Sequence, residues 1–254
     1  MADTPDSWPE LSVVVPVMDE ADNIAPLVRE IAGALEGRVA FEIVYVDDGS
    51  SDASFEQLKE LARAFPMLRA RRHATRRGQS AAILSGVKVA RAQLVATLDG
   101  DGQNDPADIP TLLERYRAYS GQRPLMLAGQ RTRRQDSWLK RTASLIANGV
   151  RTRALGDRTP DTGCGLKLFP RDVFLSFPAF DHMHRFLPAL MLRAGGHVES
   201  VPVHHRARAR GVSKYGIWDR LLVGLADLRG VAWLMRRRLS AEIAEDIGGS
   251  DANR

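Results

Sequence analysis

The chain has 254 residues, of which 44% are hydrophobic and 26% charged, and these ordinary globular values exclude a largely disordered protein. Its net charge is +5, and its 36 basic residues gather in clusters that attract nucleic acid, anionic lipid or phosphorylated substrates. A single cysteine, Cys164, excludes an internal disulfide, and the acidic N-terminus lacks the character of a secretory signal. No segment reaches the roughly 18 apolar residues of a membrane-spanning helix. We therefore expect a cytoplasmic protein that is soluble or peripheral to a membrane.

Two periodicities alternate through the first half of the chain. Short β-branched runs predict strands, and apolar residues three and four apart predict helices. The predicted strands are 11–17, 41–46, 93–98 and 125–129, and the predicted helices are 23–35, 51–65, 79–92 and 108–119. This alternation predicts an α/β fold with a Rossmann-like, doubly wound and mainly parallel sheet.

The second half of the chain is less regular. Its predicted elements are helix 137–150, strand 166–169, helix 185–195, strand 197–203 and helix 214–238. The last helix carries an apolar stripe that either packs on the core or, with its neighbouring tryptophans and arginines, lies on a membrane surface. We see no repeat and no linker, so one domain with an elaborated C-terminal third is the simplest division.

An acidic turn, DGDGQND, follows the predicted strand 93–98. Asp99 and Asp101 flank Gly100, which lets the backbone bend and approach a ligand closely. With Gln103, oxygen ligands converge in a way that suits Mg²⁺ or Mn²⁺. On its own the stretch is equally well explained as a solvated turn before a helix.

Three further polar clusters follow predicted strands, at 18–20, 47–52 and 129–131. The carboxyl ends of parallel strands share one edge of a sheet, so these clusters predict a binding rim and favour a metal at the acidic turn. A divalent ion held by few carboxylates usually keeps a phosphate as partner, and arginine suits phosphate. Asp47 and Asp48 could accept hydrogen bonds from a ribose or a base, although a turn with a helix cap explains them as well.

Five motifs then occur in order: PVMDEADNI (16–24), VDDGSSDAS (46–54), LDGDGQNDP (98–106), GCGLKLF (163–169) and RARGVSKYG (208–216). Together they resemble the family 2 glycosyltransferases, in particular the polyprenyl-phosphate branch that includes dolichol-phosphate mannosyltransferase. The resemblance extends over about residues 11 to 235. It implies a GT-A fold and a metal-dependent, inverting transfer of a hexose from a GDP- or UDP-linked donor to a dolichyl or undecaprenyl phosphate.

The resemblance also implies a division of the chain and roles for single residues. A single GT-A domain, 1–254, would have a nucleotide-sugar half at 11–131, an acceptor half at 132–238, and flexible ends at 1–10 and 246–254. The nucleoside pocket would be lined by Pro16, Met18, Glu20, Val46, Asp47 and Asp48. The diphosphate and its metal would be held by Asp99, Gly100, Asp101, Gln103, Arg131, Arg208 and Lys214. The chain departs from the family at Met18 and Asp19, where an aromatic residue and Asn are usual, so base stacking is in doubt.

The chemistry of sugar transfer is consistent with these residues. The leaving diphosphate gains negative charge, which a metal at Asp101 and the cations Arg131, Arg208 and Lys214 would stabilise. A lipid phosphate is already an anionic nucleophile and needs no strong general base, and Arg141 is the candidate to bind it. If the acceptor is instead a neutral hydroxyl, Asp161 is the candidate base.

Other interpretations remain. The same fold could act on a saccharide or other hydroxyl, or the chain could be a non-catalytic nucleotide-sugar-binding relative. A nucleic-acid partner is disfavoured because the basic segments lack interleaved aromatic residues and a helix-turn-helix signature. His182 and His184 lack the further ligands of a zinc site. The expected partners are a nucleotide sugar and a polyprenyl phosphate at the cytoplasmic membrane face, reached by peripheral contact or through a membrane protein.

Overall fold

The computed structural model describes residues 8–132, 149, 151–206 and 217–237, the last range with side chains from 224 onward. Within this part of the chain one sheet has the strand order β3-β2-β1-β4-β6-β5-β7. Its strands are β1 (Leu11–Val17), β2 (Phe41–Asp47), β3 (Leu68–Arg72), β4 (Leu94–Thr97), β5 (Leu125–Arg131), β6 (Lys167–Pro170) and β7 (His197–Val203). β6 is antiparallel to β4 and β5, and the other pairs are parallel. The predicted mainly parallel sheet is confirmed.

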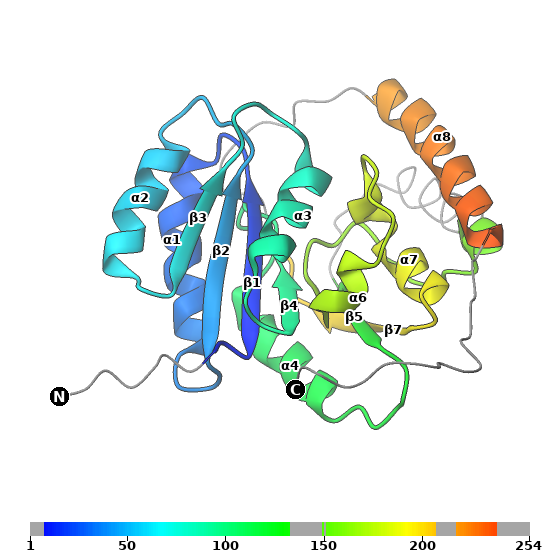
Figure 1. Cartoon of the computed structure of the whole chain (residues 1–254), viewed down its shortest axis with the longest axis horizontal. Helices are drawn as coiled ribbons and strands as arrows, with labels where there is room; N and C mark the ends of the chain where they lie inside the picture. The colour runs from blue at the N-terminus through cyan, green and yellow to red at the C-terminus, as the bar shows by residue number, and fades with distance from the viewer. Residues whose placement is uncertain (1–7, 133–148, 150, 207–216, 238–254) are drawn as a thin grey trace, which may run out of the picture.

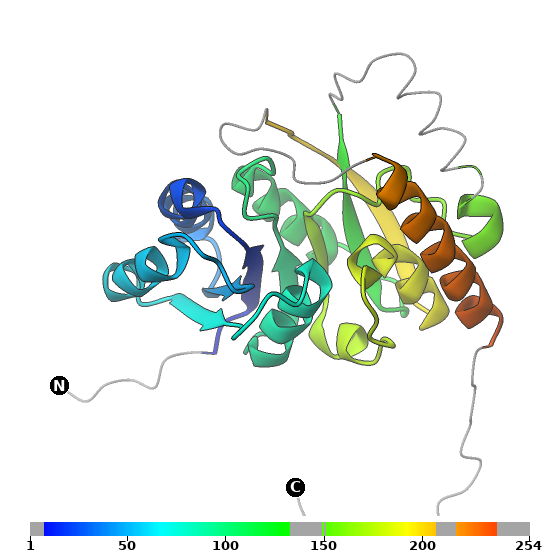
Figure 2. The same cartoon turned by 90° about the horizontal axis from the view of Figure 1, so that it is seen from above.

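Helices cover both faces of the sheet (Figures 1 and 2). One face carries α1 (Ala21–Leu35), α2 (Ser54–Ala64) and α4 (Ile109–Arg117), and the other carries α3 (Gln79–Val89), α6 (Arg171–Leu175) and α7 (Leu187–Arg193). Two short 3-10 turns, η1 (Pro106–Asp108) and η2 (Met183–Arg185), precede α4 and α7. Along β1, Val13 and Val15 join the first apolar cluster and Val14 the second, as the alternation of a buried strand requires.

α8 (Ile217–Arg236) lies outermost at the end of the molecule far from α1 and α2, over α7 (Figures 1 and 2). Val231, which is not part of the predicted stripe, is buried, and three residues of the stripe pack in the same cluster: Leu228, Ala232 and Met235. This part of the stripe therefore belongs to the core. Leu225 and Trp233 lie outside it, 48% and 59% exposed. Among the described helices, none combines the length and the apolar character needed to cross a membrane.

Two elements are missing from the sequence predictions, and some boundaries differ. β3 is an edge strand, LRARR, with only Leu68 buried; its sequence is dominated by arginine, and its apolar alternation is limited to Leu68 and Ala70. α6 has only five residues, too few to show a helical period. α2 begins at Ser54, whose N–H donates to Asp52 Oδ1 (2.9 Å), three residues later than predicted. The predicted helix 137–150 lies outside the described residues except for residue 149.

β2 carries a buried carboxylate into this apolar sheet. Glu42 is 4% exposed and accepts a hydrogen bond from Ser12 Oγ on β1 (2.7 Å). Arg69 Nη1 on β3 lies 2.5 Å from its second oxygen, and the N–H of Arg91, just before β4, donates to the first. The charge is thus paired and hydrogen-bonded, which burial of a carboxylate requires. The network connects the starts of four neighbouring segments.

Replacing this carboxylate should destabilise the fold. Glu42→Ala leaves Ser12, Arg69 and the Arg91 N–H without their acceptor, so we expect the free energy of unfolding to fall by about 3 kcal/mol. Urea denaturation followed by circular dichroism measures it. The control is Glu56→Ala, which removes an exposed carboxylate paired with Lys59 and should change little. Equal stability of the two variants would contradict a structural role for the Glu42 network.

Candidate active site

The loops that follow β1 and β2 hold each other in place. The N–H of Asp19 donates to Ser50 Oγ (2.9 Å), and the N–H of Ser51 donates to Asp19 Oδ1 (2.8 Å). Asp19 adopts φ 54°, a left-handed conformation that Asp tolerates better than most residues. Met18 and Glu20, both half-buried, are therefore presented from a fixed loop at the start of α1.

The Asp48 carboxylate, predicted to contact the nucleoside, is engaged within the protein. It accepts hydrogen bonds from the N–H groups of Arg77 (2.8 Å) and Gly78 (2.7 Å) and bonds to His73 Nδ1 (2.7 Å). These contacts fix the segment that leads into α3. The carboxylate thus supports the wall of the predicted pocket, and its contact with a nucleoside stays a prediction.

Three other predicted nucleoside residues are also buried. The Val46 side chain is in the apolar core, and Pro16 precedes the last residue of β1. Asp47 is fully buried, accepts a hydrogen bond from the Ser50 N–H (2.9 Å) and pairs with Arg72 Nε (3.1 Å). In this structure these residues shape the loop ends, and their contacts with a ligand also stay predictions.

The acidic turn packs tightly against the end of β1. A Cβ at Gly100 would overlap Val17 Cγ1 and come within 2.9 Å of the Pro16 carbonyl oxygen, so only glycine permits this approach. The turn consequently lies next to the predicted nucleoside residues, which joins the two groups of sequence-predicted positions into one site.

Asp99 is held from the other side by the loop before β6. A Cβ at Gly165 would overlap the Asp99 carboxylate, and Gln79 Nε2 donates to Asp99 Oδ1 (2.8 Å). Burial, and after it the negative charge of Asp101, raise the pKa of Asp99 to about 6. The two carboxylates of the turn are therefore close enough to repel each other.

The donor set of this turn fits a hard divalent cation. Asp99 and Asp101 offer carboxylate oxygens, whose repulsion a cation would relieve, and Asp101 Oδ1 also accepts the N–H of Gln103 (3.1 Å). In the described ranges no three His, Cys, Asp or Glu side chains gather as a metal site. An ion here would depend on Gln103 and on oxygens of a substrate to complete its coordination.

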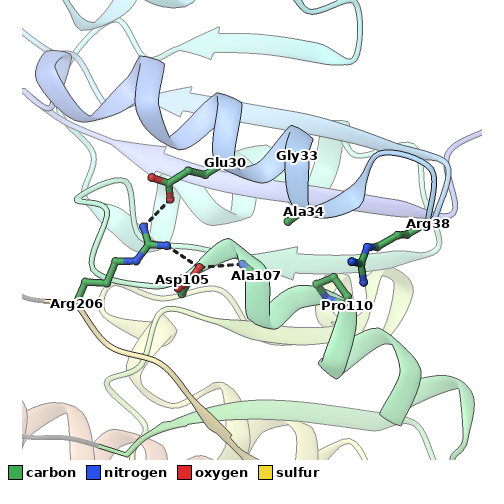
Figure 3. Close-up of a pocket in the computed structure, with 8 residues that line it drawn as sticks. All are labelled: Glu30, Gly33, Ala34, Arg38, Asp105, Ala107, Pro110 and Arg206. Atoms are coloured by element: carbon green, nitrogen blue, oxygen red, sulfur yellow. Dashed lines mark hydrogen bonds and ion pairs between the residues drawn. The ribbon is translucent and has the colours of Figure 1, made fainter.

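Arg206 ties the acidic turn to α1 and to the segment after β7. Its guanidinium lies 2.6 Å from Glu30 Oε2 and 2.7 Å from Asp105 Oδ1 (Figure 3). The backbone N–H of Arg206 donates to the Gln103 carbonyl (2.9 Å). Asp105 also accepts the N–H of Ala107 (3.0 Å), so it serves the following turn. Arg206 is the last described residue before 207–216, which contains the predicted Arg208 and Lys214. These two, and Arg141, lie outside the described residues.

Two surface cavities lie near the turn. One, of about 360 Å³, lies beside Arg206 between α1 and η1, with Arg38 and Pro110 at its other end (Figure 3), and none of the predicted site residues lines it. The other has a volume of about 120 Å³ and contains Asp99. We call the second the Asp99 cavity; its polar and glycine lining includes Gln79, Thr97, Asp99, Thr162, Gly163, Gly165, Lys167, His184 and Arg185.

Lys167 also lines the Asp99 cavity, although its sequence position did not predict a functional role. It is 3% exposed, and its ammonium group donates to the carbonyls of Cys164 and Thr162. Burial lowers the pKa of Lys167, and the negative charge of Asp99 acts in the opposite direction. The available signal was a lysine within the otherwise apolar predicted strand 166–169.

Arg131 and Asp161, predicted for different tasks, form one ion pair. Arg131 Nε and Nη2 lie 2.6 and 2.7 Å from the two carboxylate oxygens of Asp161, and the hydrogen bond with Asp161 raises the pKa of Arg131. Such a bidentate pair fixes the guanidinium in orientation. Both Asp161 oxygens are occupied by a cation, so this carboxylate positions Arg131 and is poorly placed to take a proton.

His184 is also part of the Asp99 cavity. Its Nδ1 is hydrogen-bonded to Ser80 Oγ (2.7 Å), and its backbone N–H donates to the same oxygen (3.2 Å). Burial, and after it the charge of Arg185, lower the pKa of His184 to about 3. The ring is therefore neutral at physiological pH.

Known proteins resemble this chain in sequence and in fold. The family model for glycosyl transferase family 2 matches residues 12–176. A dodecaprenyl-phosphate galacturonate synthase of Rhizobium johnstonii is 36% identical over 89% of the chain and 68% of its own length. An undecaprenyl-phosphate 4-deoxy-4-formamido-L-arabinose transferase of Edwardsiella ictaluri is 36% identical over 82% of the chain. The chain covers 63% of that enzyme, so it spans about two thirds of each relative.

A solved structure shares the fold. Glucosyl-3-phosphoglycerate synthase from Mycobacterium tuberculosis, in complex with Mn²⁺, UDP and glucosyl-3-phosphoglycerate, superimposes with a TM-score of 0.63 at 18% identity. The superposition covers 89% of this chain and 80% of that one. The predicted α/β fold of the GT-A type is confirmed, whereas identity this low carries no statement about substrates.

The buried neutral His184 should make the protein sensitive to acid. Because its folded pKa of about 3 lies below the ordinary value of 6.5, the unfolded chain takes up a proton first, and stability is lost as the pH falls from 6.5 toward 3. His184→Gln, which can keep a hydrogen bond to Ser80, should reduce the loss of unfolding free energy between pH 7.5 and pH 5 by about 1–2 kcal/mol. Denaturant titrations at both pH values measure it. The control, His197→Gln at an exposed position, should retain the wild-type loss; an unchanged loss in His184→Gln would refute the prediction.

Proposed function

The chain belongs to glycosyl transferase family 2, and from this premise we propose that it transfers a sugar from a nucleoside diphosphate to a polyprenyl phosphate at a membrane surface. The relatives at 36% identity are named for dodecaprenyl phosphate and undecaprenyl phosphate, which supports this acceptor class. One is named for galacturonate and the other for a formamido-arabinose, so the predicted hexose is widened to a sugar. The donor nucleotide, GDP or UDP, stays open.

The observation that carries this proposal is the position of the acidic turn. Gly100 brings it against the end of β1 and Gly165 lies against Asp99 from the loop before β6, so the acidic turn lies beside Pro16, one of the predicted nucleoside residues. Asp99, Asp101 and Gln103 would hold Mg²⁺ or Mn²⁺, which would neutralise charge building on the leaving diphosphate. The GT-A neighbour with Mn²⁺ and UDP supports a metal of this kind.

The cations of the chain have separate proposed tasks. Arg131, held by Asp161, would bind the donor diphosphate from a fixed direction. Arg208 and Lys214 would add to this clamp, and Arg141 would bind the acceptor phosphate. Binding two phosphate groups side by side requires such compensation of their repulsion.

The ion pair of Asp161 favours a phosphate acceptor over a hydroxyl. A hydroxyl must lose a proton as it attacks, and a base needs a free oxygen to accept it. Both Asp161 oxygens face Arg131. A phosphate monoester is already anionic and needs only to be positioned, which matches the residues present.

The proposed contact with the membrane is peripheral or through a membrane protein. On α8, Trp233 is exposed next to Arg237, whose guanidinium lies 5.3 Å from the indole ring centre. Aromatic and cationic side chains of this kind suit a helix at an anionic lipid surface. The location proposed is the cytoplasmic face of that membrane.

A transfer assay tests the proposal. The full chain is incubated with Mn²⁺, undecaprenyl phosphate and a panel of labelled UDP- and GDP-sugars, and lipid-linked product is extracted. We expect product with at least one donor and a loss of 100-fold or more, about 3 kcal/mol of transition-state stabilisation, in Asp101→Asn. Asp172→Asn, at an exposed position on α6, is the matched control and should retain activity.

Three outcomes would contradict the proposal. Product on a saccharide hydroxyl, with none on lipid for any donor, would favour the alternative acceptor class. Wild-type rates in Asp101→Asn would remove the acidic turn from the reaction. Absence of any product together with metal-dependent nucleotide-sugar binding would favour the non-catalytic relative.

A further inference from the structure

The Asp99 cavity has a cationic lining to which the proposed function assigns no task. Its volume of about 120 Å³ is several times the space that one water molecule needs, so the cavity can admit a substituent of a ligand. Because Asp99 is predicted to contact the donor, the substituent that reaches this cavity belongs most simply to the donor sugar.

The floor of the cavity is the buried Lys167. The carbonyls of Cys164 and Thr162 accept two of its three ammonium hydrogens, and among the described residues the third has no hydrogen-bond acceptor. Asp99 is near enough to offset part of its charge. A buried ammonium group requires anionic or strongly polar partners, and one position beside it is left for a ligand.

Arg185 provides a second cation at the same cavity. It is half-buried on η2, and no hydrogen bond or ion pair joins its guanidinium to any residue in the described ranges. Arg131 and Arg206, by contrast, are each held by carboxylates. A half-buried guanidinium without a counter-ion is suited to bind a planar carboxylate.

His184 completes the lining without adding charge. Its Nδ1 bonds to Ser80 Oγ, and the neutral ring leaves the positive charge of the lining to Lys167 and Arg185. Gly163 and Gly165, which also line the cavity near Asp99, add no side chains to it. The lining thus combines two cations, Lys167 and Arg185, with the Asp99 carboxylate, which the donor and its metal would engage.

We propose that the Asp99 cavity receives the carboxylate of a uronic acid on the donor sugar, with Arg185 as the specificity-determining residue and Lys167 at its floor. This inference rests on the proposed function and names the substrate class within it. A neutral hydroxymethyl group in the same place would leave both cations without a counter-ion, which a site built for an anion disfavours. The two relatives are named for an acidic sugar and a formamido sugar, so their names do not decide the matter.

Paired donors that differ only at C6 provide the test. Calorimetric titrations in Mn²⁺ compare UDP-galacturonate with UDP-galactose, UDP-glucuronate with UDP-glucose, and GDP-mannuronate with GDP-mannose. We expect the full chain to bind the uronate of at least one pair about tenfold more tightly than its neutral partner. In Arg185→Gln this preference should fall to about twofold or less, with affinities for the neutral sugar and the free nucleotide unchanged.

Two further variants separate recognition of charge from loss of packing. Arg185→Lys keeps the cation and should retain most of the preference. Arg63→Gln removes an arginine from the exposed surface of α2 and should bind every donor like the wild type.

Three results would overturn the inference. The first is equal wild-type binding of uronate and neutral sugar in all pairs. The second is an Arg185→Gln variant that binds free UDP or GDP as weakly as the uronate donors, which would place Arg185 at the diphosphate. The third is a variant with unchanged donor binding but a raised KM for undecaprenyl phosphate, which would assign Arg185 to the acceptor phosphate. Failure of transfer to lipid with every donor would refute the proposed function instead, because the paired binding measurements do not depend on transfer.

Discussion

The site depends on the close packing of one acidic turn between two backbone segments. Gly100 allows the turn to touch the end of β1, and Gly165 allows the loop before β6 to touch Asp99. Burial of Asp99 and the nearby negative charge of Asp101 raise the pKa of Asp99 to about 6. A divalent cation with a diphosphate would offset the mutual repulsion of these carboxylates, so the close packing of the turn also accounts for the ligand it suits.

Much of the sheet could be predicted because its inner strands carry their own signal. β1 and β2 are mostly apolar, as strands covered on both faces must be, apart from the paired Ser12 and Glu42, and the helix between them has a clear apolar period. β3 gave no such signal, because an edge strand needs only one buried side, here Leu68, and its arginines made it look like a basic cluster. The sequence left open whether the apolar stripe of α8 packs on the core or lies on a membrane surface. The burial of Val231 shows that one side of this helix packs on the core.

The site was predictable where chemistry is local and unpredictable where it depends on packing. Asp99 and Asp101 flank one glycine, so their convergence could be read from the chain. The engagement of Asp48 could not, because its partners are main-chain N–H groups about 30 residues away at Arg77 and Gly78. Arg185 on η2 and Lys167 on β6 line the same cavity only in the folded chain, which no spacing in the sequence reveals.

The central claim, a metal-bound nucleoside diphosphate at the acidic turn, is tested most directly by a crystal structure of the full chain with Mn²⁺ and UDP or GDP. The account predicts an anomalous manganese peak bonded to Asp101 and to diphosphate oxygens, with Asp99 and Gln103 beside it. A nucleotide bound without an ion at this turn, or an ion that contacts neither Asp99 nor Asp101, would contradict it.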